Sequence, residues 1–440
     1  MSYIGTEEGT KKFVMEQLED WSRDIEDLTK IAESDPQLAY IGYVFGTSQR
    51  WKFVCRTTPN IAHLLQPLED LIQQKLIPVL FGGRSISHDM RKVASLPARL
   101  GGLGLLNPVL EAEHEFDCSQ IMTQQLTEAI VNQRSYFQPN QEKQQEAVKL
   151  VKDKKLERHK IVTEEIKAVV SEDVFKVILL SAEKGASIWL TTLPLKELGF
   201  RLNKQDFVDS LCLRYNLRPK DVPKSCACGS DYSVNHCLTC KKGGYVHIRH
   251  DTIRNTMGEL LKEVCKDVRV EPSLLCITGE ELPSGSNLSD GARSDVSALG
   301  FWSPLCRAFF DVRIFNPFSQ SNWTNQIPKM YVRHEKEKKR EYGPRIREIE
   351  KGTFTPLVFN CAGGTAVEAT AALKTLGQKL ANKRQEPYSV IMSFIRRRLR
   401  FDLLRCCVLS LRGERGTKQI EDSKEISELD FSICEFNAGE

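Results

Sequence analysis

The sequence predicts a multidomain protein with a mostly helical N-terminal part, a small cysteine-rich segment and a C-terminal α/β part. Two observations support this fold class. Apolar side chains in residues 10–130 recur at spacings of three and four, which is the period of one helix face. In residues 246–415, helical patterns alternate with short runs of apolar and aromatic residues, which are typical of strands.

Length and composition set limits on these predictions. A chain of 440 residues with 41% hydrophobic and 27% charged residues is long enough for two to four ordinary globular domains. The formal net charge of +4 does not by itself indicate a nucleic-acid partner, so local clusters of charge matter more. No run of about 18 apolar residues predicts a membrane span. Met1 to Thr10 lacks the pattern of a secretory signal. We therefore expect an intracellular protein with reduced thiols and no membrane partner.

The N-terminal region, residues 1–135, is predicted to be helical. Trp21, Ile25 and Leu28 lie on one helix face, and Pro36 and Pro59 interrupt the pattern. Within residues 95–105, three glycines in four positions predict a tight turn with close backbone approach. Residues 136–205 follow as a charged, amphipathic stretch, which predicts one or two long helices that act as a solvated linker.

The cysteine-rich segment, residues 206–245, predicts a metal site. Cys226, Cys228, His236 and Cys240 lie within fifteen residues and supply four ligands of the kind that bind one tetrahedral Zn²⁺. Cys237 is an alternative fourth ligand. A site closed by four protein ligands leaves no position open for catalysis, so we expect a structural zinc. The alternative is that these are unrelated reduced cysteines. Four potential ligands so close together in the sequence make this alternative less favoured.

The C-terminal part, residues 246–415, predicts an α/β domain followed by a disordered tail over residues 416–440. The predicted strands are short and rich in apolar and aromatic residues. They cover Val296–Leu299, Ala308–Phe315 and Phe354–Cys361. The predicted helices cover His250–Lys266, Arg333–Glu350, Val367–Lys383 and Tyr388–Leu411.

Two acids in this part suggest a second metal site. Asp295 precedes one predicted strand and Asp311 is embedded in the next. An acid inside an apolar strand costs desolvation energy unless something compensates it. Two acids on adjacent strands can share Mg²⁺ or Mn²⁺, hard ions that retain waters for attack on phosphate. The alternative is a pair of ordinary aspartates at strand ends, since such short motifs are degenerate.

A lysine near such acids can position the attacking water or stabilise charge on the phosphate. The PD-(D/E)xK motif of metal-dependent nucleases has a lysine two residues after the second acid. This sequence has Arg313 at that position, so it departs from the motif there. The next predicted helix offers other candidates, which are Lys336, Lys338 and Lys339, with Tyr342 after them. Lysine-rich helices are also commonly plain solvated faces.

The order of these motifs resembles the C-terminal end of non-LTR retrotransposon proteins, where a CCHC zinc knuckle precedes a restriction-like endonuclease of the PD-(D/E)xK class. The chain has the Cys/His segment, then Asp295, then Asp311-Val, then Lys339-Arg-Glu-Tyr342. Ser294 replaces the usual proline before the first acid. The resemblance covers roughly residues 206–415. The Arg50-Trp51, Arg56-Thr-Thr-Pro-Asn60 and Gly-rich motifs of residues 1–135 also resemble the polymerase thumb of such proteins and the segment after it.

This resemblance implies a metal-dependent DNA endonuclease that nicks target DNA and is located in the nucleus. Asp295 and Asp311 would bind the catalytic ion, Lys339 would be the catalytic lysine and Tyr342 would support it. No Asp-Asp dipeptide occurs in the sequence, and the paired aspartates of a polymerase palm are missing. We therefore expect no polymerase activity from this chain alone.

Clustered basic residues suggest DNA as the partner, with RNA of the element as a possible additional one. The expected contacts are Lys336, Lys338, Arg340, Arg396, Arg397, Arg398 and Arg400. For the late arginine cluster, an exposed helix face is an equally good interpretation. His250 and Arg254, one helical turn apart, could face the acids or the solvent. The competing functional hypothesis is a catalytically inactive, nucleic-acid-binding remnant, and a weaker one is a purely structural interaction protein. The oligomeric state is left open.

Overall fold

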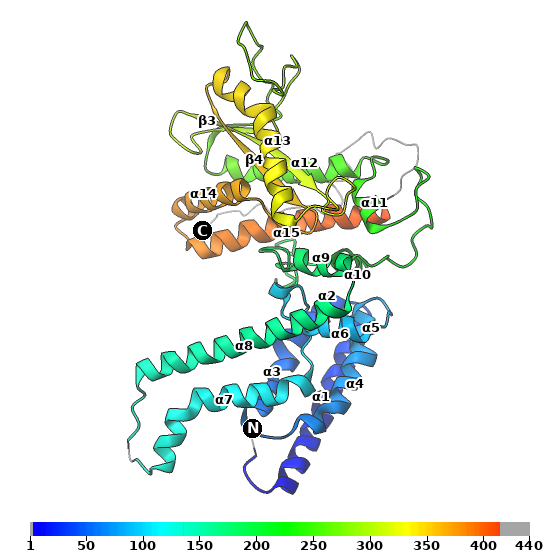
Figure 1. The fold of residues 1–440 in the computed structure, drawn as a ribbon, viewed down its shortest axis with the longest axis vertical. Helices are drawn as coiled ribbons and strands as arrows, with labels where there is room; N and C mark the ends of the chain where they lie inside the picture. The colour runs from blue at the N-terminus through cyan, green and yellow to red at the C-terminus, as the bar shows by residue number, and fades with distance from the viewer. Residues whose placement is uncertain (1–2, 135, 414–440) are drawn as a thin grey trace. The chain divides into compact units, whose positions relative to one another are not determined.

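The computed structural model describes residues 3–134 and 136–413 (Figure 1). The chain forms two compact units. Unit 1 comprises the described residues up to Leu179 together with Leu202–Val208, and unit 2 comprises Leu180–Arg201 together with the described residues from Asp209 onward. Most of the described residues are helical. The predicted tail, residues 416–440, lies outside the described residues.

Unit 1 is built from helices. Its elements are α1 (Glu7–Ala32), α2 (Pro36–Gly42), the π-helical η1 (Tyr43–Thr47), α3 (Ser48–Thr57), the 3₁₀ turn η2 (Ala62–Leu65), α4 (Gln66–Leu71), the π-helical η3 (Ile72–Leu76), α5 (Ile77–Leu80), α6 (His88–Ser95), the 3₁₀ turn η4 (Ala98–Leu100), α7 (Pro108–Val131) and α8 (Gln141–Val169). Two further helices, α9 (Glu172–Ala182) and α10 (Lys204–Tyr215), cross the boundaries between the units.

The core of unit 1 follows the predicted helix face, because Trp21 and Ile25 are almost fully buried. A buried ion pair holds the glycine-rich turn. Arg91 makes two hydrogen bonds to Glu69, at 2.8 and 2.7 Å, and donates a third to the Leu105 carbonyl at 2.6 Å. The predicted close approach is present, because a Cβ on Gly102 would lie 2.0 Å from the Leu96 carbonyl oxygen.

The long charged helix that the sequence predicts is α8, but it is not a free linker. Lys155 of α8 pairs with Glu115 of α7 at 3.2 Å, and Arg158 pairs with Glu111 at 3.0 Å. Residues 136–205, which we expected to form one linker, are divided between the units: α8 packs within unit 1, and Leu180–Arg201 belongs to unit 2.

Unit 2 contains a four-stranded mixed sheet in the order β1-β2-β3-β4. The strands are β1 (Lys266–Val270), β2 (Val296–Leu299), β3 (Arg307–Phe315) and β4 (Thr353–Asn360). Strand β2 pairs antiparallel with both β1 and β3, and β3 pairs with β4 in parallel. The predicted strands match β2, β3 and β4 to within one residue. Strand β1 was missed because it is an exposed edge strand with charged residues and no buried apolar run.

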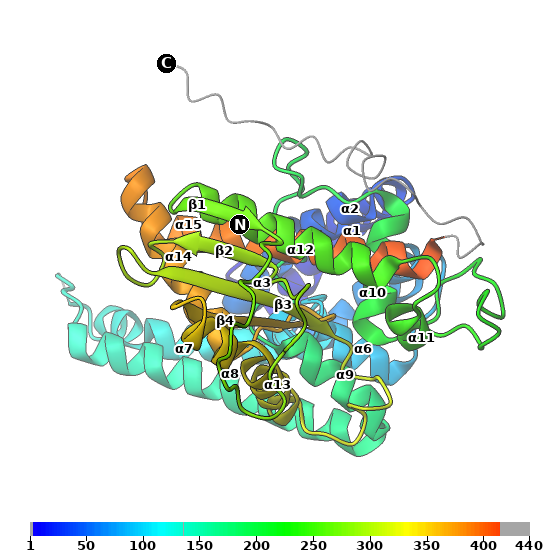
Figure 2. The same cartoon turned by 90° about the horizontal axis from the view of Figure 1, so that it is seen from above.

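Helices cover both faces of this sheet (Figure 2). The helices of unit 2 are α11 (Val234–Thr239), α12 (Tyr245–Lys262), α13 (Ile327–Glu348), α14 (Val367–Arg384) and α15 (Tyr388–Arg412). One core contains Phe310 and Leu357 of the sheet with apolar residues of α12, α14 and α15. On the other face, Phe309 packs with Ile346 of α13. Among the described residues, no helix is both long and apolar enough to cross a bilayer.

Candidate functional site

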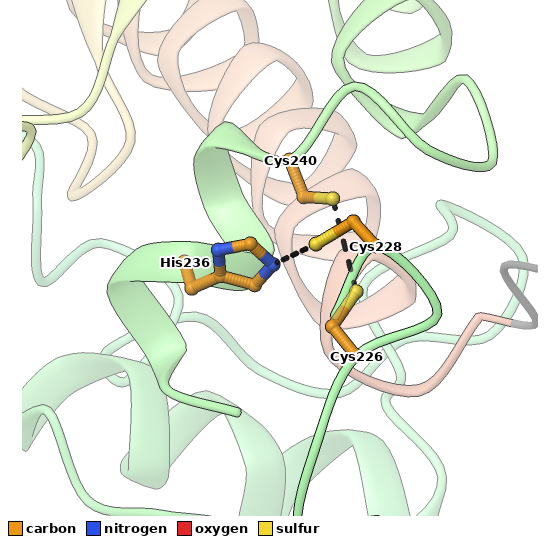
Figure 3. Close-up of side chains that lie close together, drawn as sticks. All are labelled: Cys226, Cys228, His236 and Cys240. Atoms are coloured by element: carbon orange, nitrogen blue, oxygen red, sulfur yellow. Dashed lines mark hydrogen bonds between the residues drawn. The ribbon is translucent and has the colours of Figure 1, made fainter. Parts of the chain in front are cut away.

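The four predicted zinc ligands come together in unit 2 (Figure 3). The Sγ atoms of Cys226 and Cys240 are 3.8 Å apart, and Cys228 Sγ is 3.2 Å from His236 Nε2. All four ligand atoms lie within 4.8 Å of one another. In a tetrahedral site with Zn–S bonds of about 2.3 Å, two sulfurs are about 3.8 Å apart. The cluster can therefore hold a metal ion such as zinc.

Local chain geometry explains how the segment closes. Gly229 has φ of +91°, a left-handed conformation that favours glycine, and turns the chain directly after Cys228. An antiparallel bridge between Ser225 and Asp231 closes this turn. Helix α11 then begins after Ser233, whose hydroxyl accepts a hydrogen bond from the His236 backbone N–H at 3.0 Å.

Cys237, the alternative fourth ligand, is not part of this cluster. Its side chain is fully buried in the apolar core with Val234 and Leu238. His236 and Cys237 are neighbours on a helix, so their side chains point in different directions, and only His236 reaches the other ligands. A hydrogen bond with Ser230 lowers the pKa of the Cys228 thiol to about 6, which favours the thiolate that a metal requires.

The two predicted acids lie at the end of the pairing between β2 and β3. Strands β2 and β3 pair antiparallel with Val296 opposite Phe310. Asp295 directly precedes Val296 and Asp311 directly follows Phe310, so the two acids are neighbours at the end of the β2–β3 pairing. Both carboxylates are largely buried, with side-chain exposures of 15% and 6%. The strand pairing therefore brings together two acids that are sixteen positions apart in the sequence.

The Asp295 carboxylate lies beside β3, just before the first residue of β2. Strand β3 continues to Phe315, beyond its last partner on β2. The Val312 backbone N–H donates to Asp295 Oδ2 at 2.6 Å, and the Val312 carbonyl lies 3.1 Å from His250 Nε2. These two side chains therefore satisfy the backbone groups of β3 that would otherwise need a strand partner.

His250, from α12, contacts Asp295 directly. Its Nε2 is 3.1 Å from Asp295 Oδ2, and its Nδ1 is 3.2 Å from Asp251 Oδ1. Burial opposes the charged imidazolium, but hydrogen bonds with Asp251 and Asp295 outweigh it and raise the pKa of His250 to about 9. Both ring nitrogens face acceptors, which requires both to carry protons. Arg254, one turn later, pairs with Glu271 at 2.5 Å and with Asp251 at 3.1 Å, so it does not complete the acid pair.

Asp311 receives its positive partner from α13. Lys338 Nζ lies 3.0 Å from Asp311 Oδ2, and the Lys338 side chain is only 18% exposed. Burial raises the pKa of Asp311 to about 6, with Lys338 lowering it and Asp295 raising it. The same pair raises the pKa of Lys338 against the effect of burial. The lysine therefore offsets only part of the negative charge that the two acids place here.

Lys339, the lysine that the resemblance selects, does not reach the acids. Its Nζ pairs with Glu368 Oε1 at 2.5 Å on the surface. Tyr342 does lie near the acids, with its ring centroid 5.1 Å from Lys338 Nζ. The periodicity of α13 could have identified the correct lysine. The residues on its inner face recur at spacings of three and four, and they are Tyr331, His334, Lys338 and Tyr342. Lys338 therefore shares this face, and Lys339 lies outside it.

Ser294, which departs from the family pattern, has a structural role. Its hydroxyl donates to the Phe310 carbonyl at 2.9 Å, and the residue is almost fully buried. This bond ties the start of β2 to β3 immediately before Asp295. A proline at this position could not make it, because proline has no polar side chain.

The predicted basic contacts fall into two groups. Lys336 and Arg340 are exposed and line an open groove on the outer side of α13, together with Lys329 and Arg333. Arg398 instead pairs with Glu259 of α12. Arg396 and Arg397 are half-buried. Arg400 is 8% exposed and donates to the Ala186 carbonyl at 3.2 Å. The late arginine cluster is therefore not a continuous exposed face, and its contact with nucleic acid stays a prediction.

No protein-family model matches the sequence, and no curated protein matches it. A functional assignment therefore depends on the chemistry of the two side-chain clusters.

Proposed function

We propose that unit 2 is a divalent-metal-dependent DNA endonuclease in which Asp295 and Asp311 hold the catalytic ion. The observation that carries this proposal is the pair of largely buried acids at the end of the β2–β3 pairing, with Lys338 at 3.0 Å from Asp311. Such a combination of two carboxylates and an amine is the chemistry that metal-assisted phosphodiester hydrolysis needs.

The residues fit a hard divalent cation. Among the described residues, no hydrogen bond or ion pair engages Oδ1 of Asp295 or Oδ1 of Asp311, which leaves one oxygen of each carboxylate for a metal. Burial raises the pKa of Asp311, and a divalent cation bound beside it would favour the ionised carboxylate. Mg²⁺ or Mn²⁺ prefers such oxygen ligands and would supply an activated water and charge neutralisation.

The protein's own groups have distinct roles in this proposal. Lys338 replaces Lys339 as the candidate catalytic amine, because only Lys338 reaches an acid of the pair. His250 and Val312 orient the Asp295 carboxylate. The exposed bases Lys336 and Arg340 on α13 would bind the DNA backbone. The Cys/His cluster would be a structural zinc site, and unit 1 a polymerase-derived platform for nucleic acid.

The direct test is a nicking assay on supercoiled plasmid with Mg²⁺. Asp311→Asn keeps the shape of the side chain and removes its charge, so we expect nicking to fall at least about 100-fold. Glu341→Gln, on the neighbouring helix α13, serves as a control for loss of an acid near the site. Equal nicking by the parent and Asp311→Asn would reject the assignment.

A second candidate function is a nucleic-acid-binding protein without cleavage. The observation that favours it is that each acid already has a cationic neighbour, Asp295 in His250 and Asp311 in Lys338. These cations could replace the metal permanently. Salt-dependent DNA binding without nicking, over a range of Mg²⁺ and Mn²⁺ concentrations, would identify this function.

A further inference from the structure

A cavity of about 250 Å³ lies in unit 2, away from the two clusters described above. Its walls come from the segment around Gly185, from the end of β4 and the loop after it, and from α14 and α15. Three cationic side chains line it: Lys184, Arg396 and Arg400. None of the three forms an ion pair with an acid among the residues that the structure describes.

Arg400 carries the argument, because it is a buried cation with unused hydrogen-bonding capacity. It is 8% exposed, and its Nε donates to the Ala186 carbonyl at 3.2 Å. Its Nη1 is buried without a partner. Burial lowers the pKa of Arg400 to about 10, which still leaves it charged at neutral pH. A buried guanidinium group without an ion-pair partner is costly, so an anion in the adjoining cavity would be attracted by its charge.

The absence of a side chain at Gly363 leaves space for the Arg400 guanidinium group. A Cβ on Gly363 would lie 2.8 Å from Cδ, Nε and Cζ of Arg400. Gly363 also has φ of +100°, which favours glycine for a second reason. The loop after β4 therefore fits closely over the Arg400 side chain, and any larger residue would displace it.

The one acid in the cavity wall does not neutralise these cations. Glu183 accepts hydrogen bonds from Asn360 Nδ2 at 2.6 Å and from the Tyr331 hydroxyl at 3.0 Å. Burial raises its pKa, against these hydrogen bonds, which favours the neutral form. The hydroxyl groups of Thr365 and Thr370 add further donors to the lining.

We propose that this cavity binds the phosphate group of a small phosphate ester. Two guanidinium groups and an amine suit a multiply charged anion with several acceptor oxygens, and guanidinium groups match phosphate geometry well. Phe359, Leu373 and Met392 give the cavity an apolar wall for the organic part. A volume of about 250 Å³ is just below the usual range for drug-sized ligands, which limits that part to about one nucleoside.

The test is equilibrium binding to the full chain, measured by calorimetry with thymidine 5′-monophosphate and with thymidine as the phosphate-free control. We expect saturable binding of the monophosphate only. Arg396→Ala should weaken it at least about tenfold. Arg397→Ala, the neighbouring residue that does not line the cavity, should change it less than about twofold. Binding of both compounds alike, or equal affinity in Arg396→Ala and the parent, would overturn the proposal.

A second arm identifies the source of the phosphate. A 5′-phosphorylated oligonucleotide that binds more tightly than its 5′-hydroxyl counterpart, with the difference lost in Arg396→Ala, would assign the cavity to a strand end. A monophosphate that binds when neither oligonucleotide shows this difference would assign it to a free ester. Asp311→Asn should bind the monophosphate normally, so this proposal and the nuclease proposal can fail independently.

Discussion

The Cys/His cluster and the acid pair both bring together side chains of kinds that can bind metals, but they are assembled at different levels of structure. The cluster draws four ligands from fifteen consecutive residues, and a glycine turn and one short helix bring them together. The acid pair requires the register of two strands, a histidine from α12 and a lysine from α13. A local motif can therefore be assigned from spacing, whereas a site built by packing needs the fold to identify its members.

The two sites also differ in how charge is compensated. The cluster contains no cationic side chain among its four ligands, so a metal is the natural partner of its thiolates. The acids already have His250 and Lys338 beside them. We therefore expect removal of metal to affect the Cys/His segment more than the acid site.

The largest expected effect is on zinc content. The full chain should bind about one zinc ion, and Cys240→Ser should lose it because a three-ligand site is much weaker. Cys237→Ala is the matched control, since Cys237 lies in the core and outside the cluster. Metal analysis of the purified proteins measures the stoichiometry. Zinc retained in Cys240→Ser and lost in Cys237→Ala would reverse the ligand assignment.

The next effect separates two adjacent lysines. Lys338→Met should reduce Mg²⁺-dependent nicking at least about 100-fold, because it removes the amine beside Asp311. Lys339→Met should change nicking less than about threefold, because that lysine only pairs with Glu368 on the surface. Rates of plasmid nicking measure both. The reverse order of effects would restore the lysine that the sequence resemblance selects.

An intermediate effect concerns the pH dependence of stability. His250 has a pKa raised to about 9 in the folded protein, so its stabilising contribution is complete below the unfolded value near 6.5 and is lost as pH rises through about 9. Allowing for partial exposure, we expect a loss of about 2 kcal/mol between pH 6.5 and 9.5.

This pH effect is measured by urea unfolding at several pH values, without added divalent metal, for the parent and His250→Gln. Gln keeps hydrogen-bonding groups but cannot be protonated, so the difference between the two proteins should shrink as pH rises. A difference that stays constant from pH 6.5 to 9.5 would show that His250 is not charged in the folded protein.

The smallest effect concerns the groove on α13. Lys336→Ala and Arg340→Ala should each weaken DNA binding only a few-fold and lower the salt slope by about one, as expected for single phosphate contacts. Lys374→Ala, an exposed lysine of α14 outside this groove, provides the control. Fluorescence anisotropy at several salt concentrations measures these changes. An unchanged salt slope in both groove variants would exclude this surface from DNA binding.

The sequence determined the local features of this protein. The periodicity of apolar residues predicted the helices, and the short aromatic-rich runs predicted β2, β3 and β4. The spacing of Cys226, Cys228, His236 and Cys240 was sufficient for the ligand cluster, because few residues separate them and a single turn decides their geometry.

Only the tertiary structure decided which distant side chains meet. The exposed edge strand β1 has no apolar run that sequence patterns could detect. The choice of Lys338 over Lys339 depends on which face of α13 packs on the sheet, and a shift of one residue rotates a side chain by about 100°. Burial of Arg400 under the loop at Gly363 likewise arises from packing between segments far apart in the chain.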